Sequence, residues 1–123
     1  MKRIPDTEYE IMNIIWSYDR AVTTNDIYSH LEKDKWKVPT IISFLKRLEG
    51  KGFVSSEKKG KERYYTSIVT QEEYVRFETK LFFDKYHRNS FSSFMTALYG
   101  SDKISDNELE LLETKIDELI RDD

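Results

Sequence analysis

The segment from Thr40 to Val54, TIISFLKRLEGKGFV, limits most strongly what this chain can fold into. Apolar residues recur in it at helical spacing, basic side chains occupy the remaining face, and a strand-like pair follows Gly52. A glycine just after the last periodic residue indicates the end of a helix, because it adopts the left-handed conformation of a C-terminal cap. The segment therefore predicts a helix that stops abruptly and turns into a β-strand.

The first half of the chain contains patterns for three helices. TEYEIMNIIWSY has apolar residues at helical spacing, and Thr7 and Glu10 have the spacing of a capping box. TTNDIYSHLEK predicts a second helix of about three turns, with Thr23 or Thr24 as its N-cap. The third helix has Pro39 in its first turn, where a missing amide costs no helical hydrogen bond. Its apolar side consists of Val38, Ile41, Leu45 and Leu48, with Phe44 beside them.

Two β-prone runs follow the third helix, at residues 53–57 and 63–69, separated by the basic glycine turn KKGK. They predict a hairpin with a charged tip. Three helices followed by such a hairpin form a winged helix-turn-helix. The predicted fold is therefore mainly α with a small β-hairpin wing: a DNA-binding winged helix over residues 1–69 and a helical dimerisation region over residues 70–123.

The net charge of −3 hides two halves of opposite sign. Residues 1–66 hold 13 Lys and Arg against 10 Asp and Glu, whereas residues 67–123 hold 7 against 13. The basic excess is concentrated between Lys33 and Arg63, where 10 basic residues accompany 4 acidic ones. A solvated lysine-rich surface is one reading of this pattern. Its position on a helix and a turn that could reach the same DNA backbone favours nucleic-acid binding.

The exposed flank of the third helix and the tip of the hairpin supply the candidate DNA contacts. A helix fits the major groove, where hydroxyls can meet base edges, an aliphatic group a thymine methyl, and arginine the two acceptors of guanine. Basic side chains on the wing are expected to meet phosphate, which adds affinity and salt dependence without sequence choice. The helix candidates are Thr40, Ile42, Ser43, Lys46 and Arg47, and the wing candidates are Lys58, Lys59, Lys61 and Arg63.

Residues 70–123 contain patterns for three further helices. Thr70 with Glu73 and Ser105 with Glu108 have capping-box spacing, and Gly100 is expected to stop the middle helix. The last helix has an apolar seam of about two heptads, too short to be stable alone. A homodimer on a palindromic operator is therefore favoured over helices that fold back on the winged domain of a monomer. The predicted dimerisation residues are Tyr74, Phe77, Leu81, Phe91, Phe94, Leu109, Leu112, Ile116 and Leu119.

Four segments, in order and at matching spacing, carry a resemblance to a known family. They are EYEIMNIIW, TIISFLKRLEGKGFV, GKERYYTSIVTQEEY and ISDNELELLETKIDEL. With them the chain resembles, over nearly its whole length, the penicillinase-repressor family, which includes BlaI, MecI and the copper-responsive CopY. The resemblance implies a homodimeric winged-helix repressor of transcription. Family DNA contacts carry over to the five helix candidates above, although many members have arginine or lysine where this chain has Ile42.

The resemblance also implies a way for repression to end. Members that control β-lactam resistance are inactivated when a membrane-sensor pathway cuts them in the helix before the last one, typically at an asparagine–phenylalanine bond. The corresponding bond here is Ala97–Leu98, and neither residue matches the usual pair. A regulatory protease is thus a partner that the resemblance suggests, at an altered site.

Several other kinds of site are not favoured. The chain has no cysteine, which excludes disulfides, thiolate metal sites and the cysteine cluster with which CopY-like members respond to metal. His30 and His87 lack a partner histidine at helical spacing, so no metal or other cofactor is expected. Trp16 and Trp36 fit core or junction packing better than an aromatic ligand cage. Neither a phosphate-binding glycine loop nor a serine–histidine–acid set points to an enzyme.

The remaining sequence evidence concerns location and two rival functions. No apolar run approaches the roughly 18 residues that span a bilayer, and the start MKRIPDTEYE turns acidic, so a cytoplasmic protein is expected. A one-component regulator that senses a small effector stays open, and it would be stabilised thermally by that ligand. A winged-helix module that binds protein also stays open, and it would show no salt-dependent binding to duplex DNA.

Overall fold

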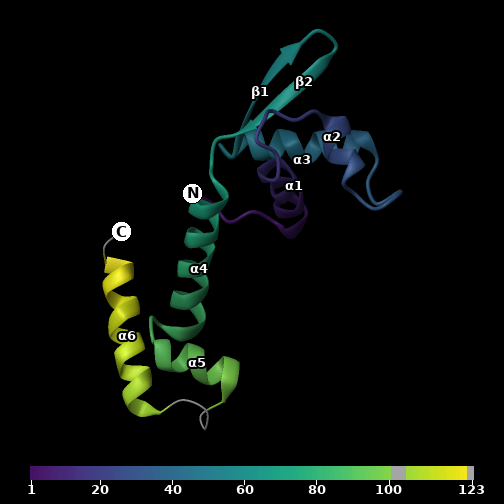
Figure 1. Cartoon of the computed structure of the whole chain (residues 1–123). Coiled ribbons are helices and arrows are strands. Elements are labelled where there is room, and N and C mark those ends of the chain that lie inside the picture. The colour runs from purple at the N-terminus through teal and green to yellow at the C-terminus, as the bar shows by residue number, and fades with distance from the viewer. Residues whose placement is uncertain (101–104, 122–123) are drawn as a thin grey trace. The chain divides into compact units, whose positions relative to one another are not determined.

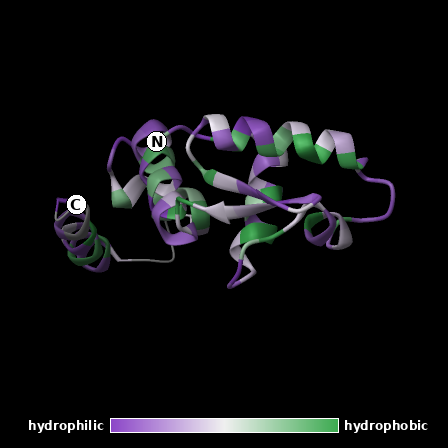
Figure 2. Ribbon diagram, turned by 90° about the horizontal axis from the view of Figure 1, so that it is seen from above, coloured by the Kyte–Doolittle hydropathy of each residue, from purple (hydrophilic) through white to green (hydrophobic). Residues whose placement is uncertain are grey.

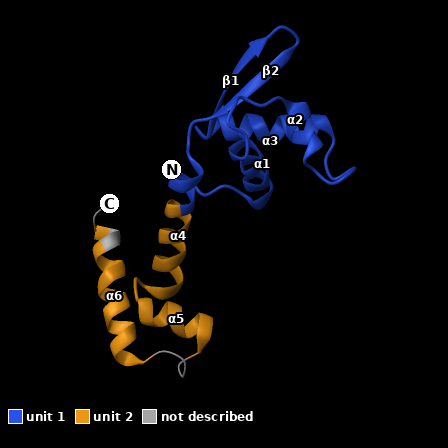
Figure 3. Cartoon of the chain, viewed as in Figure 1, with its two compact units in different colours: residues 1–75 blue, residues 76–123 orange. Residues whose placement is uncertain are grey.

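The computed structural model describes residues 1–100 and 105–121, apart from the side chains of residues 119 and 120. The chain forms two compact units, Met1–Val75 (unit 1) and Arg76–Asp123 (unit 2), and each is described by itself (Figure 3). The division falls within a helix, later than the boundary predicted between residues 69 and 70. The assignment of residues 70–123 to dimerisation stays a prediction.

The described residues form six helices and one hairpin (Figure 1). In chain order the elements are α1 (Asp6–Trp16), α2 (Thr24–Ser29), α3 (Val38–Gly50), β1 (Val54–Lys59), β2 (Glu62–Ser67), α4 (Gln71–His87), α5 (Phe91–Tyr99) and α6 (Asp106–Arg121). The predicted fold class, mainly α with a β-hairpin wing, is confirmed.

The core of unit 1 lies where the apolar sides of α1 and α3 meet. Ile11 and Ile15 of α1 and Leu45 of α3 are buried, as their helical spacing predicts. Burying an aliphatic side chain of this size contributes about 1.5–3 kcal/mol. The other buried apolar residues of unit 1 are Ile4, Met12, Val22, Ile27, Ile41, Leu48, Phe53, Val54, Tyr65 and Tyr74.

The start of α1 differs from the prediction. Its N-cap is Pro5, and no side chain among the described residues caps it. Ile4 is buried just before the helix, and its amide donates to the Tyr74 hydroxyl at 2.9 Å. Because this anchor fixes where the chain enters α1, Thr7 lies inside the first turn. The predicted capping box of Thr7 with Glu10 is wrong for that reason.

The start of α2 resolves the choice between two caps. The Thr23 hydroxyl accepts from the Asp26 amide at 3.1 Å, and the Thr23 amide donates to the Asp26 carboxylate at 3.0 Å. Thr23 is therefore the N-cap of a capping box. The helix ends at Ser29, earlier than predicted, because the amides of His30 and Leu31 bond three residues back in a tightened last turn.

The end of α3 confirms the predicted glycine cap. Gly52 has a φ of +80°. Its amide donates to the Glu49 carbonyl at 3.0 Å, and the Phe53 amide donates to the Leu48 carbonyl at 2.9 Å. This pair of bonds is a Schellman motif, and it directs the chain straight into β1.

The hairpin consists of two antiparallel strands in register from Val54 opposite Ser67 to Lys59 opposite Glu62. Gly60 opens the turn with a φ of +64°, the conformation that a type II′ hairpin turn needs at its first central position. Both predicted strands are confirmed, but they extend further toward the turn, since so tight a turn lets the ladder continue to its edge.

Unit 2 contains most of α4 together with α5 and α6. Phe94 of α5 joins α5 to α4, because its ring centroid lies 6.0 Å from that of Phe83 and 5.3 Å from that of His87. Gly100 ends α5 with a φ of +83°, as predicted. Helix α5 contacts α6, and hydrophobic and hydrophilic residues are interspersed along α6 (Figure 2).

Candidate nucleic-acid interface

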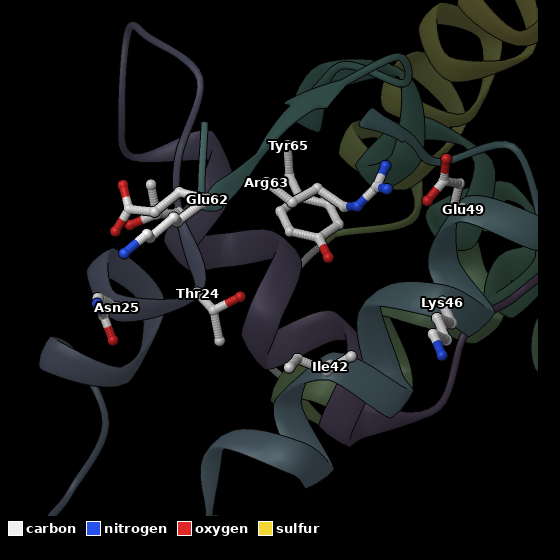
Figure 4. A pocket seen from close by; sticks show the side chains of 10 residues that line it. Thr24, Asn25, Ile42, Lys46, Glu49, Glu62, Arg63 and Tyr65 are labelled. Carbon is white, nitrogen blue, oxygen red and sulfur yellow. The ribbon is translucent and has the colours of Figure 1, made fainter. Parts of the chain in front are cut away.

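A pocket with a volume of about 540 Å³, here called the recess, lies between α2, α3 and β2 of unit 1 (Figure 4). Ile42 and Lys46 line it from α3, Arg63 lines it from β2, and Thr24 and Asn25 line it from the start of α2. The other lining residues are Thr23, Glu49, Lys61, Glu62 and Tyr65. Three elements that lie apart in the sequence thus present charged and polar groups to one recess.

The predicted DNA contacts on α3 fall on different flanks of the helix. At about 100° per residue, Ile42 and Lys46 share the flank that lines the recess. Thr40 and Ser43 are exposed on α3 but lie outside the lining of the recess. The structure therefore brings two of the five predicted helix residues into the recess.

Arg47 lies on the other flank of α3. Its guanidinium carbon is 5.8 Å from the centre of the Phe44 ring, and Phe44 packs edge-on against Trp36 with 5.1 Å between centroids. The Lys35 ammonium lies 5.0 Å from the centre of a Trp36 ring. This flank carries a second basic surface, separate from the recess, in which Lys35 and Arg47 are exposed and the rings of Trp36 and Phe44 are half-buried.

The four basic residues predicted on the wing also divide. Cross-strand partners point to the same face, so Lys58 and Arg63 share one face of the hairpin. Lys59 lies on the opposite face, where its ammonium is 5.8 Å from the centre of the Tyr64 ring. Lys61 occupies the turn and lines the recess together with Arg63. All four are exposed.

Tyr65 fixes the wing to the segment before α2. Its amide donates to the Val22 carbonyl at 2.8 Å, and the Val22 amide donates to its carbonyl at 2.9 Å. Burial raises the pKa of the Tyr65 phenol, so its hydroxyl stays neutral. The two backbone hydrogen bonds hold β2 beside the start of α2, and these two segments form adjacent sides of the recess.

A hydrogen-bond chain links the wing to α3. Arg63 Nη1 donates to the Ser56 hydroxyl at 2.9 Å, and that hydroxyl donates to the Glu49 carboxylate oxygens at 2.9 and 3.0 Å. Arg63 lies on β2, Ser56 on β1 and Glu49 on α3. In Figure 4 the Arg63 guanidinium points toward Glu49.

An ion pair holds the start of α2. Arg20 Nη1 lies 2.9 Å from Asp26 Oδ2. The hydrogen bond from Arg20, followed by that from the Thr23 amide, lowers the pKa of Asp26 to about 2. The Asp26 carboxylate thus remains ionised at neutral pH. It completes the cap of α2, the helix start that places Thr24 and Asn25 at the recess.

Sequence reasoning misses six lining residues of the recess: Thr23, Thr24, Asn25, Glu49, Glu62 and Tyr65. Glu49 and Glu62 are acidic residues inside the most basic segment, and Thr24 and Asn25 resemble ordinary helix-start residues. A usable signal exists for Glu49, because it follows Lys46 by three residues and so shares its flank of α3.

Tyr74 is not part of a dimerisation surface, contrary to the sequence prediction. Its side chain is 0% exposed within unit 1. Its ring centroid lies 5.7, 6.1 and 5.4 Å from those of Tyr9, Trp16 and Phe53. Because it has no surface left for a second copy of the chain, Tyr74 is a core residue of the winged helix.

The other predicted dimerisation residues lie in unit 2 with different exposures. Leu81 of α4 and Leu112 of α6 are exposed, Phe91 is buried, and the side chain of Leu119 lies outside the described residues. The half-buried members are Phe77, Phe94, Leu109 and Ile116. The residues at the predicted cleavage position, Ala97 and Leu98, are exposed near the end of α5.

The histidines have hydrogen-bond partners of their own. His30 Nε2 lies 2.7 Å from the Tyr18 hydroxyl, and His87 Nδ1 lies 2.9 Å from the Ser93 hydroxyl. Across residues 1–100 and 105–121, no group of three or more His, Cys, Asp or Glu side chains is arranged to hold a metal ion. Over the same described residues, every helix is too short or too polar to cross a membrane.

Comparison with known proteins identifies the family. The profile of the penicillinase repressor family matches residues 4–118. A penicillinase repressor from Bacillus licheniformis is 28% identical over 116 residues, which cover 91% of this chain and 90% of that protein. The methicillin resistance regulatory protein MecI from Staphylococcus aureus (strain N315) is 31% identical over 110 residues, 89% of each chain. The solution structure of the DNA-binding domain of the repressor BlaI matches with a TM-score of 0.51 and 33% identity, covering 60% of this chain and 94% of that one. The chain belongs to the penicillinase repressor family.

Proposed function

We propose that the chain is a DNA-binding repressor of transcription. Its family supports this proposal, since the relatives that it matches over most of its length are named as a repressor and a resistance regulator. The observation that carries the proposal is the recess, which is lined by Lys46 of α3, Lys61 of the hairpin turn and Arg63 of β2. Basic side chains on a helix and on a wing suit the phosphates on either side of a DNA groove.

In the proposed complex α3 enters the major groove. Ile42 contacts a thymine methyl, and the exposed hydroxyls of Thr40 and Ser43 reach base edges. Lys46 binds phosphate at the edge of the groove, and Arg63 and Lys61 bind the backbone beyond it. Sequence choice therefore comes from α3, whereas the wing supplies affinity.

A DNA shift assay tests this function. The full chain is titrated onto the fragment upstream of its own gene and onto a scrambled duplex of equal length and composition, across a salt series. Preference for the upstream fragment, with affinity that falls steeply as salt rises, is the expected result. Equal and salt-independent behaviour on both duplexes would contradict it and would favour a protein-interaction module.

We further propose that unit 2 joins two copies of the chain into a homodimer on a palindromic operator. The support is its exposed apolar surface: Leu81, Phe82, Tyr86, Leu98, Tyr99, Leu111 and Leu112. Burying apolar area gains about 25 cal/mol per Å². A two-fold dimer would also match the symmetry of paired half-sites.

A regulatory protease completes the proposed function by resemblance to the family. The support from this chain is limited to exposure, because Ala97 and Leu98 lie at the surface near the end of α5. A cut there would separate α6 from the winged helix.

A further inference from the structure

Glu49 places a negative charge on the surface that the proposed function turns toward phosphate. It is exposed, and it lines the recess together with Lys46 and Arg63 (Figure 4). A carboxylate in that position repels DNA wherever it approaches the recess. The hydrogen bonds that the Glu49 carboxylate accepts indicate a structural role on this surface.

The carboxylate of Glu49 fixes the orientation of the Ser56 hydroxyl. A serine hydroxyl has a single hydrogen, and here that hydrogen is directed at the Glu49 oxygens at 2.9 and 3.0 Å. Its lone pairs are then free to accept from Arg63 Nη1 at 2.9 Å. The Glu49 carboxylate on α3 thus sets the donor-to-acceptor direction of both hydrogen bonds. The oriented Ser56 hydroxyl then holds the Arg63 guanidinium of β2 in place. Hydrogen bonds to charged groups at both ends make this the strong kind of link.

We propose that Glu49 is a positioning and specificity-determining residue for DNA, an inference that rests on the proposed DNA-binding function. Through Ser56 it holds Arg63 ready for a phosphate of a duplex that is fully seated in the recess. Its charge weakens binding to any duplex that does not bring phosphates against both Lys46 and Arg63. Specificity then rises because wrong complexes are penalised, in addition to the gain from pre-orienting a correct contact.

Two substitutions separate the positioning role from the charge role. Ser56→Ala removes the hydroxyl and keeps the carboxylate, whereas Glu49→Gln removes the charge and keeps an oxygen that can accept from Ser56. Ser56→Thr retains a hydroxyl and serves as the rescue variant. Glu57→Gln is the matched charge control, because Glu57 is exposed on the same strand and points to the opposite face of the wing.

The experiment measures binding of the full-length variants by fluorescence anisotropy across a KCl series. One labelled duplex is the sequence that the wild-type chain enriches from a random-sequence library, and the other is its scrambled version. Ser56→Ala should weaken binding to the selected duplex about tenfold, the loss of one charged hydrogen bond, and leave the scrambled duplex unchanged. Ser56→Thr should restore binding. Glu49→Gln should strengthen binding to the scrambled duplex about threefold, the effect of one unit charge near a phosphate in water.

Each outcome bears on one statement. Equal losses on both duplexes for Ser56→Ala, or the same loss for Ser56→Thr, would overturn the positioning role. A gain on scrambled DNA that Glu57→Gln reproduces in full would overturn the charge role. Thermal unfolding of every variant checks that the winged helix is intact. If the wild-type chain enriches no duplex and binds without salt dependence, the proposed DNA-binding function itself is wrong. That result can be told apart from the loss of the positioning role and from the loss of the charge role, because both of these appear only in the variants.

Discussion

The ammonium of Lys51 lies 2.7 Å from Oε1 of Glu8, whose side chain is only 2% exposed. Glu8 belongs to α1, and Lys51 follows directly after α3. The ion pair therefore joins the two helices that build the core of unit 1. A buried carboxylate of this kind is tolerated only while its partner is present, because its own desolvation is otherwise uncompensated.

We expect Lys51→Ala to lower the free energy of unfolding by about 1–3 kcal/mol, since it leaves Glu8 buried without a counter-charge. The matched control is Lys35→Ala. Lys35 pairs with Glu10 at 2.8 Å, but the two side chains are 35% and 40% exposed, so its loss should cost less than about 1 kcal/mol. Urea unfolding of the three proteins compares the two pairs. Equal losses would show that burial of Glu8 does not govern the cost.

The Arg20–Asp26 pair predicts an acid-sensitive start of α2. The pKa of Asp26 is lowered to about 2 in the folded chain, against about 3.9 in an unfolded one. A lowered pKa means that the carboxylate stabilises the fold above the unfolded value, and that this contribution disappears as the pH falls through about 4 toward 2. Wild type should therefore be more stable than Asp26→Asn at pH 5, and the difference should shrink as the pH approaches 2.

Urea unfolding of wild type and Asp26→Asn at several pH values between 5 and 2 measures this difference. Glu57→Gln serves as the control, because Glu57 is an exposed carboxylate away from the pair. A difference between wild type and Asp26→Asn that stays constant over the whole pH range would contradict the assignment of the stabilisation to the ionised Asp26 side chain.

Local patterns predict most of the elements, because they depend on neighbours in the sequence. The spacing of Ile41, Leu45 and Leu48 identifies α3. Gly52 marks its end, because the left-handed backbone conformation of the cap favours glycine. What periodicity cannot supply is the identity of the surface that covers an apolar face. Tyr74 is an example: its position on α4 predicts burial correctly, but its partners are the rings of unit 1.

The same limit applies to the recess. The charge count and helix pattern identify α3 and the wing as candidate DNA contacts. The helical period places Lys46 and Arg47 on different flanks of α3, but it does not show that Lys46 lines the recess while Arg47 lies beside the Phe44 ring. The link from Arg63 through Ser56 to Glu49 joins residues on three elements, so it depends on a tertiary arrangement that no local pattern encodes.

Substitutions on the two flanks of α3 test how the helix sits in the groove. Lys46→Ala should weaken binding to the upstream fragment and reduce the salt slope by about 0.9, the contribution of one phosphate contact. Arg47→Ala should cost about 1–3 kcal/mol and relax specificity at one base pair, as expected for a guanidinium that bridges the acceptors of guanine. Both effects are measured by shift assays on operator variants.

Lys59→Ala is the control for these substitutions. Lys59 lies on the wing outside the lining of the recess, so its loss should weaken all duplexes alike without a change in sequence preference. If the Arg47 variant, like the Lys59 variant, lost affinity equally on operator and scrambled DNA, base recognition by Arg47 of α3 would be wrong.

The last prediction concerns a chain that ends at Ala97. Such a chain keeps unit 1 with its own core but lacks α6, and with it Leu109, Leu112 and Ile116 of the predicted dimer seam. We expect it to be folded in its winged helix and largely monomeric. Two unlinked winged helices lose the effective-concentration gain of about 10²–10⁴ in affinity, so the truncated chain should leave the operator unoccupied at concentrations where the full chain saturates it.

Sedimentation and a shift assay on the truncated chain decide this prediction, and a pair of full-length variants removes the ambiguity of a deletion. Leu112→Lys places a charge on the predicted seam, whereas Glu110→Lys places the same charge on an exposed position of the same helix. The first should reproduce the monomer and its weak operator binding, because a buried ammonium without a partner opposes association. The second should remain dimeric. A truncated chain that stayed dimeric with unchanged operator affinity would show that α6 does not link the two winged helices, and that any regulatory cut after Ala97 must act by another route.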